Sequence, residues 1–253
     1  MMKQMRFSAL ATVSFLSVLS LSACGVTGIP VVGKSVNSLA GQYDETEARL
    51  STAAASAIAE GKTDEALVQY EKLYKKNRSN LEVAVNYAQL LRKTGKTENA
   101  LAVLRPFMTQ EDGKPRAKIN PLVLNEFAAA NISLGRFDPA EKTLNDVLED
   151  SSAKDFHNDA YNLMGVALDA KGEHKEAEDM FRQALDGWKG DSTSVMNNLA
   201  LSLANQGRFD ESLTILREAL IKAPDKQEIA RNIRLVGGLR DSIVPKAPTN
   251  LKK

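Results

Sequence analysis

Residues 160–185, AYNLMGVALDAKGEHKEAEDMFRQAL, describe a complete helical hairpin. The first half carries an apolar stripe with the helical spacing i, i+3, i+4, i+7: Tyr161, Met164, Gly165 and Leu168. The second half carries a similar stripe: Ala177, Met180, Phe181, Ala184 and Leu185. Gly172 lies between the two halves, where a helix that must end in a left-handed conformation favours glycine. The stretch therefore predicts two antiparallel helices joined by a tight turn.

The same pattern occurs five times along the chain, and each copy has a glycine at its turn: Gly61, Gly95, Gly135, Gly172 and Gly207. Five residues after each glycine stands a small residue: Ala66, Ala100, Ala140, Ala177 or Ser212. Seven residues before each glycine stands another: Ala54, Ala88, Ala128, Gly165 or Ala200. Four residues after the first set stands a bulky residue: Tyr70, Leu104, Leu144, Phe181 or Leu216. Small residues let helices cross closely and bulky ones fill the space between hairpins, so the spacing predicts a stack of five hairpins.

With its period of about 34 residues, the chain resembles the tetratricopeptide-repeat family. The residues that match the family pattern are Tyr161, Gly165, Ala177, Phe181, Ala184 and Pro224. The resemblance implies an all-α fold, a right-handed superhelical solenoid of helical hairpins. We expect the repeats at 47–80, 81–114, 121–154, 158–191 and 193–226. A capping helix over 227–242 is expected to cover the exposed end of the array.

The first 23 residues have the composition of an export signal. Lys3 and Arg6 precede an apolar, serine-rich run over 7–21, which is shorter than the roughly 20 residues of a membrane span. The run ends in Leu21-Ser22-Ala23-Cys24, which resembles the lipobox of bacterial lipoproteins. The resemblance implies cleavage before Cys24 and lipidation, for example with palmitate, of that cysteine. An ordinary signal peptide followed by a chance cysteine is the alternative.

The residues after Cys24 indicate where such an anchor would lie. Gly25 is not an aspartate, and its resemblance to the enterobacterial sorting pattern implies the periplasmic face of the bacterial outer membrane. Residues 24–46 are rich in glycine and serine without a sustained period, which predicts a flexible tether. Residues 243–253 contain two prolines and two terminal lysines, and we expect a disordered tail.

Composition and motifs argue against several classes of function. A formal net charge of +1 provides no basic surface for nucleic acid. Two Gly-Lys-Thr triplets, at 61–63 and 95–97, lack the earlier glycine of a phosphate-binding loop. One cysteine and two histidines, His157 and His174, form neither a disulfide nor a plausible zinc site, and we expect both histidines to be exposed. We predict no catalytic residue, metal, cofactor or small-molecule substrate, and keep an enzyme only as a less favoured hypothesis.

The concave face of the stack is the predicted binding surface. Each repeat is counted from fourteen residues before its turn glycine, and position five then reads Ser51, Val85, Asn125, Asn162 and Asn197. An asparagine ladder can pair with the backbone of an extended peptide, and the neighbouring apolar residues can form pockets: Leu122, Ile132, Val166 and Leu201. Equally, asparagine suits a solvated helix face or bonds between neighbouring helices. Trp188 seals the end of its own helix or, less favoured, anchors an interface.

The whole plan resembles the TadD family of tight-adherence (Flp) pilus assembly lipoproteins. The resemblance rests on the lipobox, the five repeats and a final run matched at Arg231, Asn232, Leu235, Gly238 and Leu239. It implies a scaffold, anchored to the outer membrane by its N-terminal lipid, that binds an envelope protein or an extended peptide segment. The implied partner is an outer-membrane secretin or another pilus component. The alternative is an adaptor for peptidoglycan hydrolases or outer-membrane assembly factors.

Overall fold

The computed structural model describes residues 44–110, 112–114 and 116–243. The predicted export signal, Cys24, nearly all of the tether and nearly all of the tail lie outside these residues. The regular structure of the described residues is helical, without a β-strand. The helices are α1 Glu45–Ala59, α2 Thr63–Lys76, α3 Leu81–Lys93, α4 Thr97–Met108, α5 Pro121–Ser133, α6 Phe137–Glu149, the 3-10 helix η2 Ser151–Phe156, α7 His157–Lys171, α8 His174–Leu185, α9 Thr193–Asn205, α10 Phe209–Lys222 and α11 Gln227–Ile243.

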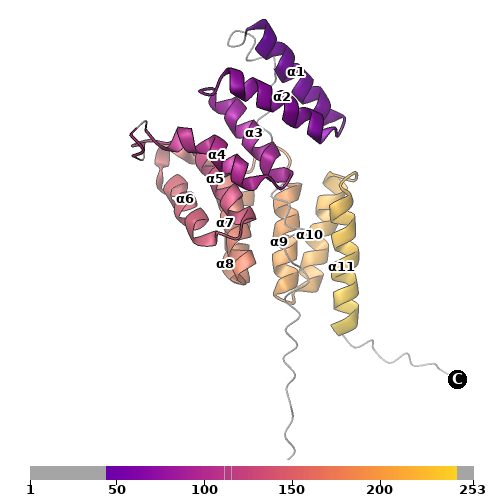
Figure 1. Ribbon diagram of the computed structural model, residues 1–253. Helices are drawn as coiled ribbons and strands as arrows, with labels where there is room; N and C mark the ends of the chain where they lie inside the picture. The colour runs from indigo at the N-terminus through magenta and orange to yellow at the C-terminus, as the bar shows by residue number, and fades with distance from the viewer. Residues whose placement is uncertain (1–43, 111, 115, 244–253) are drawn as a thin grey trace, which may run out of the picture.

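The α-helices pack in chain order as five hairpins, α1/α2 to α9/α10, with α11 against the last of them. From α3 onward, the first helix of each hairpin also contacts the first helix of the next one, and α9 contacts α11 in the same way. Figure 1 shows the hairpins following one another along a curved path from indigo α1 to yellow α11. The predicted all-α solenoid is confirmed.

All five turn glycines adopt the left-handed conformation, with φ between 70° at Gly61 and 86° at Gly172. A side chain is strained in this region, so glycine is the residue that closes the turn at low cost. In every copy, the residue after the glycine donates its backbone N–H to the carbonyl four residues before the glycine, at 2.8 or 2.9 Å. The hairpins therefore share one turn geometry as well as one spacing.

The small positions of the repeat are the points of closest helix contact. The alanines at both positions are fully buried, and so is Ser212, whose hydroxyl donates to the Ala200 carbonyl at 2.6 Å. In the fourth repeat a Cβ on Gly165 would lie 2.6 Å from the ring of Phe181, which is itself buried. The small residues thus let each hairpin close around the bulky residue that follows.

Specific side chains fix the first and the last helix of the array. Asp44 and Glu47 form a capping box at the start of α1, with the Asp44 carboxylate accepting from the Glu47 backbone N–H at 2.9 Å. Because of this cap, α1 begins at Glu45, inside the range expected for the tether. At the other end, α11 buries Ile229 and Val236 and extends to Ile243.

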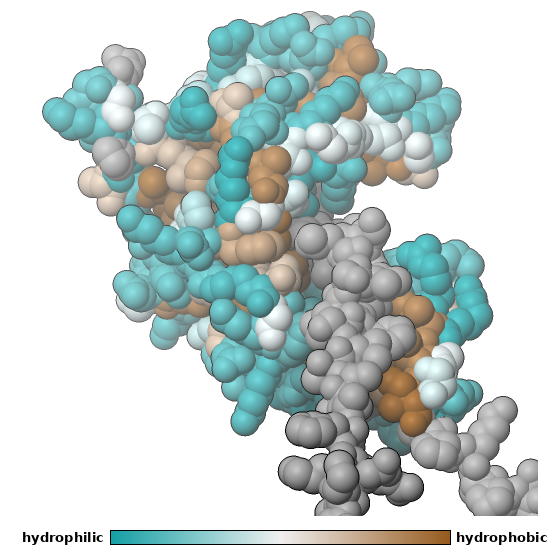
Figure 2. All heavy atoms as spheres, turned by 60° about the horizontal axis from the view of Figure 1, so that its bottom comes forward, coloured by the Kyte–Doolittle hydropathy of each residue, from teal (hydrophilic) through white to brown (hydrophobic). Residues whose placement is uncertain are grey.

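The surface of the described residues is mostly hydrophilic. On the face drawn in Figure 2, teal residues predominate and brown apolar residues form separate patches. The large apolar side chains that are exposed lie towards the ends of the array: Ile58, Val68, Ile221, Leu235 and Ile243. Within residues 44–243, leaving aside 111 and 115, no helix has the length and apolar character needed to cross a membrane.

Candidate binding groove

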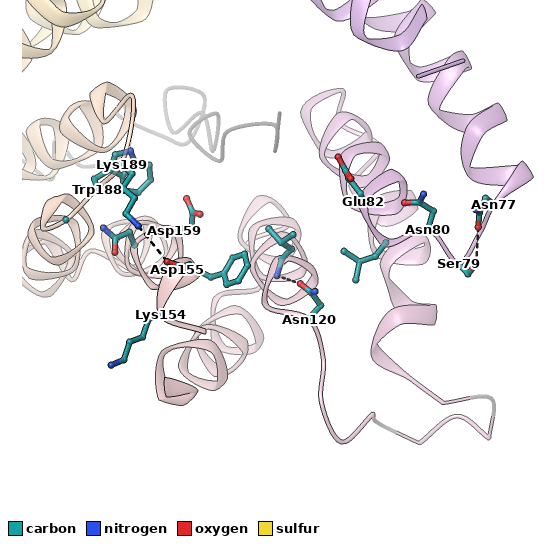
Figure 3. A pocket seen from close by; sticks show the side chains of 15 residues that line it. Asn77, Ser79, Asn80, Glu82, Asn120, Lys154, Asp155, Asp159, Trp188 and Lys189 are labelled. Atoms are coloured by element: carbon teal, nitrogen blue, oxygen red, sulfur yellow. Dashed lines mark hydrogen bonds and ion pairs between the residues drawn. The ribbon is translucent and has the colours of Figure 1, made fainter. Parts of the chain in front are cut away.

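A groove of about 1070 Å³ opens between the start of α3 and the loop that joins α8 to α9. The starts of α5 and α7 lie between these two walls, as Figure 3 shows. Its apolar lining consists of Leu81, Leu122, Phe156 and Trp188. The groove is therefore built from the first turns of α3, α5 and α7, together with η2 and the loops that join α2 to α3 and α8 to α9.

Asparagine side chains fix these first turns. The Asn80 side chain accepts a hydrogen bond from the Val83 backbone N–H at 3.1 Å, and Asn120 accepts from the Leu122 N–H at 2.9 Å. Both residues are N-caps, which satisfy backbone donors that a helix start leaves unpaired. The starts of α3 and α5, which both line the groove, are thus fixed by the local sequence.

The loop that presents Trp188 is held against the start of α7. The Asn158 amide donates to the backbone carbonyls of Ala184 and Asp186, each at 2.9 Å. The Trp188 indole N–H donates to the Asp191 carbonyl at 3.2 Å. Trp188 is half-buried and packs against the central core while also lining the groove. Its core packing agrees with a residue that seals the end of its helix, and its place in the groove leaves part of the ring open.

The charged lining consists of Glu82, Lys154, Asp155, Asp159 and Lys189. Lys189 and Asp155 lie 3.8 Å apart and are both highly exposed, so their attraction is weak. Asp159 is half-buried in the first turn of α7, and burial raises the pKa of its carboxyl to about 6. At neutral pH Asp159 is therefore an ionised but poorly hydrated carboxylate.

The predicted asparagine ladder does not line this groove. Asn125, Asn162 and Asn197 are only 3%, 2% and 6% exposed. The Asn125 amide donates to the Phe156 carbonyl at 3.3 Å. Asn162 accepts from the amide of Asn198 at 3.2 Å, and Asn197 accepts from that of Asn232 at 2.8 Å. Asn162 thus bonds the next repeat, Asn197 bonds α11 and Asn125 bonds η2, so bonding between neighbouring helices, the alternative that the sequence left open, is what the structure shows.

The predicted apolar pockets divide in the same way. Ile132, Val166 and Leu201 are buried in the core, and none of them lines the groove. Leu122 does line it. The next first helix packs against α5 and α7, as α11 does against α9, and Asn162 and Asn197 lie in these contacts, whereas Leu122 lies at the start of α5. Position two lines the groove in the second, third and fourth repeats, with Glu82, Leu122 and Asp159, and position one does so with Leu81 and Asn158.

The two histidines are half-buried, so the expectation that they are exposed was wrong. His174 Nδ1 lies 2.7 Å from an Asp169 carboxylate oxygen. The Ser202 hydroxyl donates to the His174 backbone carbonyl and does not reach the imidazole. This pair therefore ties α7 to α8 without presenting a nucleophile to the ring. The described residues contain no cluster of three or more side chains suited to hold a metal ion.

The final run of the sequence is shared between two faces of α11. Asn232 is buried against Asn197, as described above. Arg231, Leu235 and Gly238 lie on the other side of this helix, and a Cβ on Gly238 would meet nothing within 4 Å. Asn232 thus has a packing role that its pattern alone does not reveal.

Three family models described as tetratricopeptide repeats match residues 57–118, 127–192 and 193–223, which together make up more than half of the chain. The chain belongs to the tetratricopeptide-repeat (TPR) family. Repeats of this kind stack into a scaffold for protein–protein interaction. No curated protein sequence matches the chain.

A solved TPR structure shares this fold. This thermophilic TPR protein of Thermus thermophilus is 20% identical and has a TM-score of 0.64, with 75% of this chain and 98% of that chain aligned. MamA from Desulfovibrio magneticus RS-1 is 14% identical with a TM-score of 0.48, over 75% of this chain and 97% of that one. A TPR protein from Parabacteroides merdae is 17% identical with a TM-score of 0.47, over 77% and 75%.

Proposed function

We propose that this TPR protein is a non-catalytic scaffold that holds an extended segment of an envelope protein in the groove. The observation that carries the proposal is the groove itself. Its volume is about 1070 Å³, and both apolar side chains and polar residues at helix starts line it. Such a lining suits a peptide, whose side chains enter apolar pockets while its backbone meets polar groups.

The cellular setting that we propose rests on the sequence. The tetrad from Leu21 to Cys24 supports a lipid anchor, and Gly25 supports its location at the periplasmic face of the outer membrane. The final run with Arg231 and Leu239 supports a role in tight-adherence pilus assembly, where the partner is the outer-membrane secretin or another pilus component. The scaffold would then assist assembly or localisation of the secretin.

Site-specific photo-crosslinking in living cells tests the groove. A photoreactive phenylalanine derivative replaces Leu122 in the groove or, as a matched control, the exposed Val68 on α2, which does not line it. We expect a crosslink to a secretin or pilus component from position 122 and none from position 68. Crosslinks from 122 to peptidoglycan hydrolases would favour the adaptor function instead. Absence of any crosslink from 122 contradicts the groove.

The anchor and the pilus role are tested separately. We expect Cys24→Ser to lose labelled palmitate and to leave the membrane fraction. Deletion of the gene is expected to reduce both secretin multimers and surface pili. Normal amounts of multimers and pili in the deletion strain would overturn the pilus role and leave the groove to be judged by crosslinking.

A further inference from the structure

Asp159 is a charged group in the groove for which the described residues supply no partner. Nothing in the part of the chain that the structure describes forms a hydrogen bond or an ion pair with its carboxylate, and its pKa is raised by burial alone. A carboxylate that has lost part of its hydration without gaining a donor destabilises the folded protein. A cation supplied by a bound partner would remove that cost.

The charges around Asp159 also favour a cationic partner. Lys189 is placed close to Asp155, and Lys154 points away from the opening in Figure 3. Figure 3 also shows the carboxylate of Glu82 on the wall formed by α3, across from Asp159 on α7. The groove therefore has the Asp159 carboxylate on α7 and the Glu82 carboxylate on α3, on opposite sides of its opening.

Trp188 adds an aromatic surface on the same side of the groove as Asp159. The residue next to Asp159 in the chain, Asn158, bonds the carbonyls of Ala184 and Asp186 and thereby holds the Trp188 loop beside the start of α7. An aromatic ring next to a carboxylate suits a lysine or arginine side chain, because the ring covers the methylene stem and attracts the cation.

We propose that the segment held in the groove carries a lysine or arginine whose cation pairs with Asp159 while its stem lies along Trp188. This inference rests on the proposed function, since it specifies the chemistry of the occupant of the same groove. It commits to a protein segment with a basic side chain, and the Asp159 carboxylate disfavours an acidic segment.

The protein contains its own reporter for this test, because Trp188 is its only tryptophan. The full-length chain is titrated with an acetylated and amidated octapeptide, Ser-Thr-Leu-Lys-Val-Leu-Thr-Ser, and Trp188 emission is recorded. Two companion peptides replace the lysine with uncharged norleucine or with glutamate. We expect a saturable change in emission with the lysine peptide and affinities at least about tenfold lower for the other two, the scale of one charge-assisted hydrogen bond.

Two variants complete the design. Asp159→Asn removes the charge with little change of shape, and we expect it to bind the lysine peptide no better than the norleucine peptide. Asp179→Asn removes an exposed charge on α8 that does not line the groove, and we expect it to bind like the wild type. Circular dichroism confirms that both variants are folded.

The outcomes separate the two proposals. Equal binding of the lysine and norleucine peptides, with a clear change in Trp188 emission, overturns the cation preference and supports the groove. Unchanged affinity of Asp159→Asn for the lysine peptide also overturns the role of Asp159. No change in emission with any peptide contradicts both the cation preference and the groove.

Discussion

Gly165 and Phe181 pack so closely in the fourth repeat that no Cβ fits between them. The equivalent positions of the second, third and fifth repeats hold an alanine and a leucine. The fourth repeat thus has a smaller residue on its first helix and a larger one on its second helix. A methyl group at 165 would lie within 3 Å of three atoms of the Phe181 ring. The fourth repeat therefore depends on glycine in a way the others do not.

We expect Gly165→Ala to lower the free energy of unfolding by about 1–3 kcal/mol, because the buried ring has to move. Urea unfolding measures the change. Gly238→Ala is the matched control: it adds a methyl group to a helix where nothing lies within 4 Å, and it should be neutral or slightly stabilising. The double variant Gly165→Ala/Phe181→Leu recreates the alanine–leucine pair and should recover part of the loss. Equal stability of Gly165→Ala and wild type contradicts this account.

Asp159 gives the folded protein a pH dependence of unusual sign. Its pKa is about 6 in the folded chain, above the ordinary value of 3.8, so the folded state holds this proton more tightly than the unfolded state. Its contribution to stability is therefore highest at low pH and is lost as the pH rises from about 4 to about 6. We expect Asp159→Asn to exceed the wild type in stability by roughly 1–2 kcal/mol at pH 7. Denaturation at a series of pH values measures the difference, which should shrink towards pH 4; a difference independent of pH contradicts the assignment.

Residue identity and spacing predicted the buried positions better than the binding ones. Asn162 and Asn197 stand at a repeat position that suits a peptide and a neighbouring helix equally well. Which of the two they meet depends on how far the next first helix overlaps, and this crossing is a property of two repeats together. Asp159 has no distinguishing pattern in the sequence, because its burial arises in the assembled groove.

At the scale of elements, a buried ion pair joins α3 to α5. Arg92 Nε donates to one Glu126 carboxylate oxygen at 2.7 Å and its terminal nitrogen donates to the other at 3.1 Å. The two side chains are 4% and 1% exposed. Such a pair orients two helices through fixed geometry, although the loss of hydration offsets much of its attraction.

We expect Glu126→Ala to destabilise the protein by about 3–5 kcal/mol, because it leaves the Arg92 charge buried without its carboxylate. The double variant Arg92→Leu/Glu126→Leu should cost clearly less. Glu45→Ala serves as the control, since the pair between Glu45 and Arg49 is exposed and its loss should be hardly measurable. Thermal unfolding compares the three, and a double variant as unstable as Glu126→Ala would show that the charge is not the cause.

The helices themselves were predictable from local sequence to different degrees. The turn glycines and the small positions define every hairpin, because both follow from contacts within one repeat. The 3-10 helix η2 was not predicted. Its six residues are mostly polar and lack a period, and they adopt this form where Asp150 caps the segment by accepting from the Ser152 N–H at 2.8 Å.

At the scale of the whole molecule, the described part of the array is stabilised by contacts between neighbouring repeats. Interior repeats have two neighbours, whereas α1 and α11 are covered on one side. We therefore expect native-state hydrogen exchange to be fastest in α1 and α11 and slowest in α5 to α8. Gly165→Ala should speed exchange most in α7 and α8 and least in α1. Uniform protection along the chain would contradict a nearest-neighbour array.

The repeat period was enough to predict the overall architecture but not the place of the groove. A period of about 34 residues with paired small positions predicts a stack of helical hairpins. The groove depends on the loop from Gly187 to Lys189, which lies at the end of the fourth repeat beyond the positions that the repeat pattern specifies.

Side-chain hydrogen bonds from Asn198 to Asn162 and from Asn232 to Asn197 each link one first helix to the helix one period further along the chain. Tension applied between Asp44 and Ile243 would therefore be transmitted from each repeat to the next along the described chain. We therefore expect a sufficiently large load to unfold the array one hairpin at a time, because each repeat contacts only its neighbours. The asparagines that do not face the groove would therefore carry load along the array, because each bonds a helix that follows it.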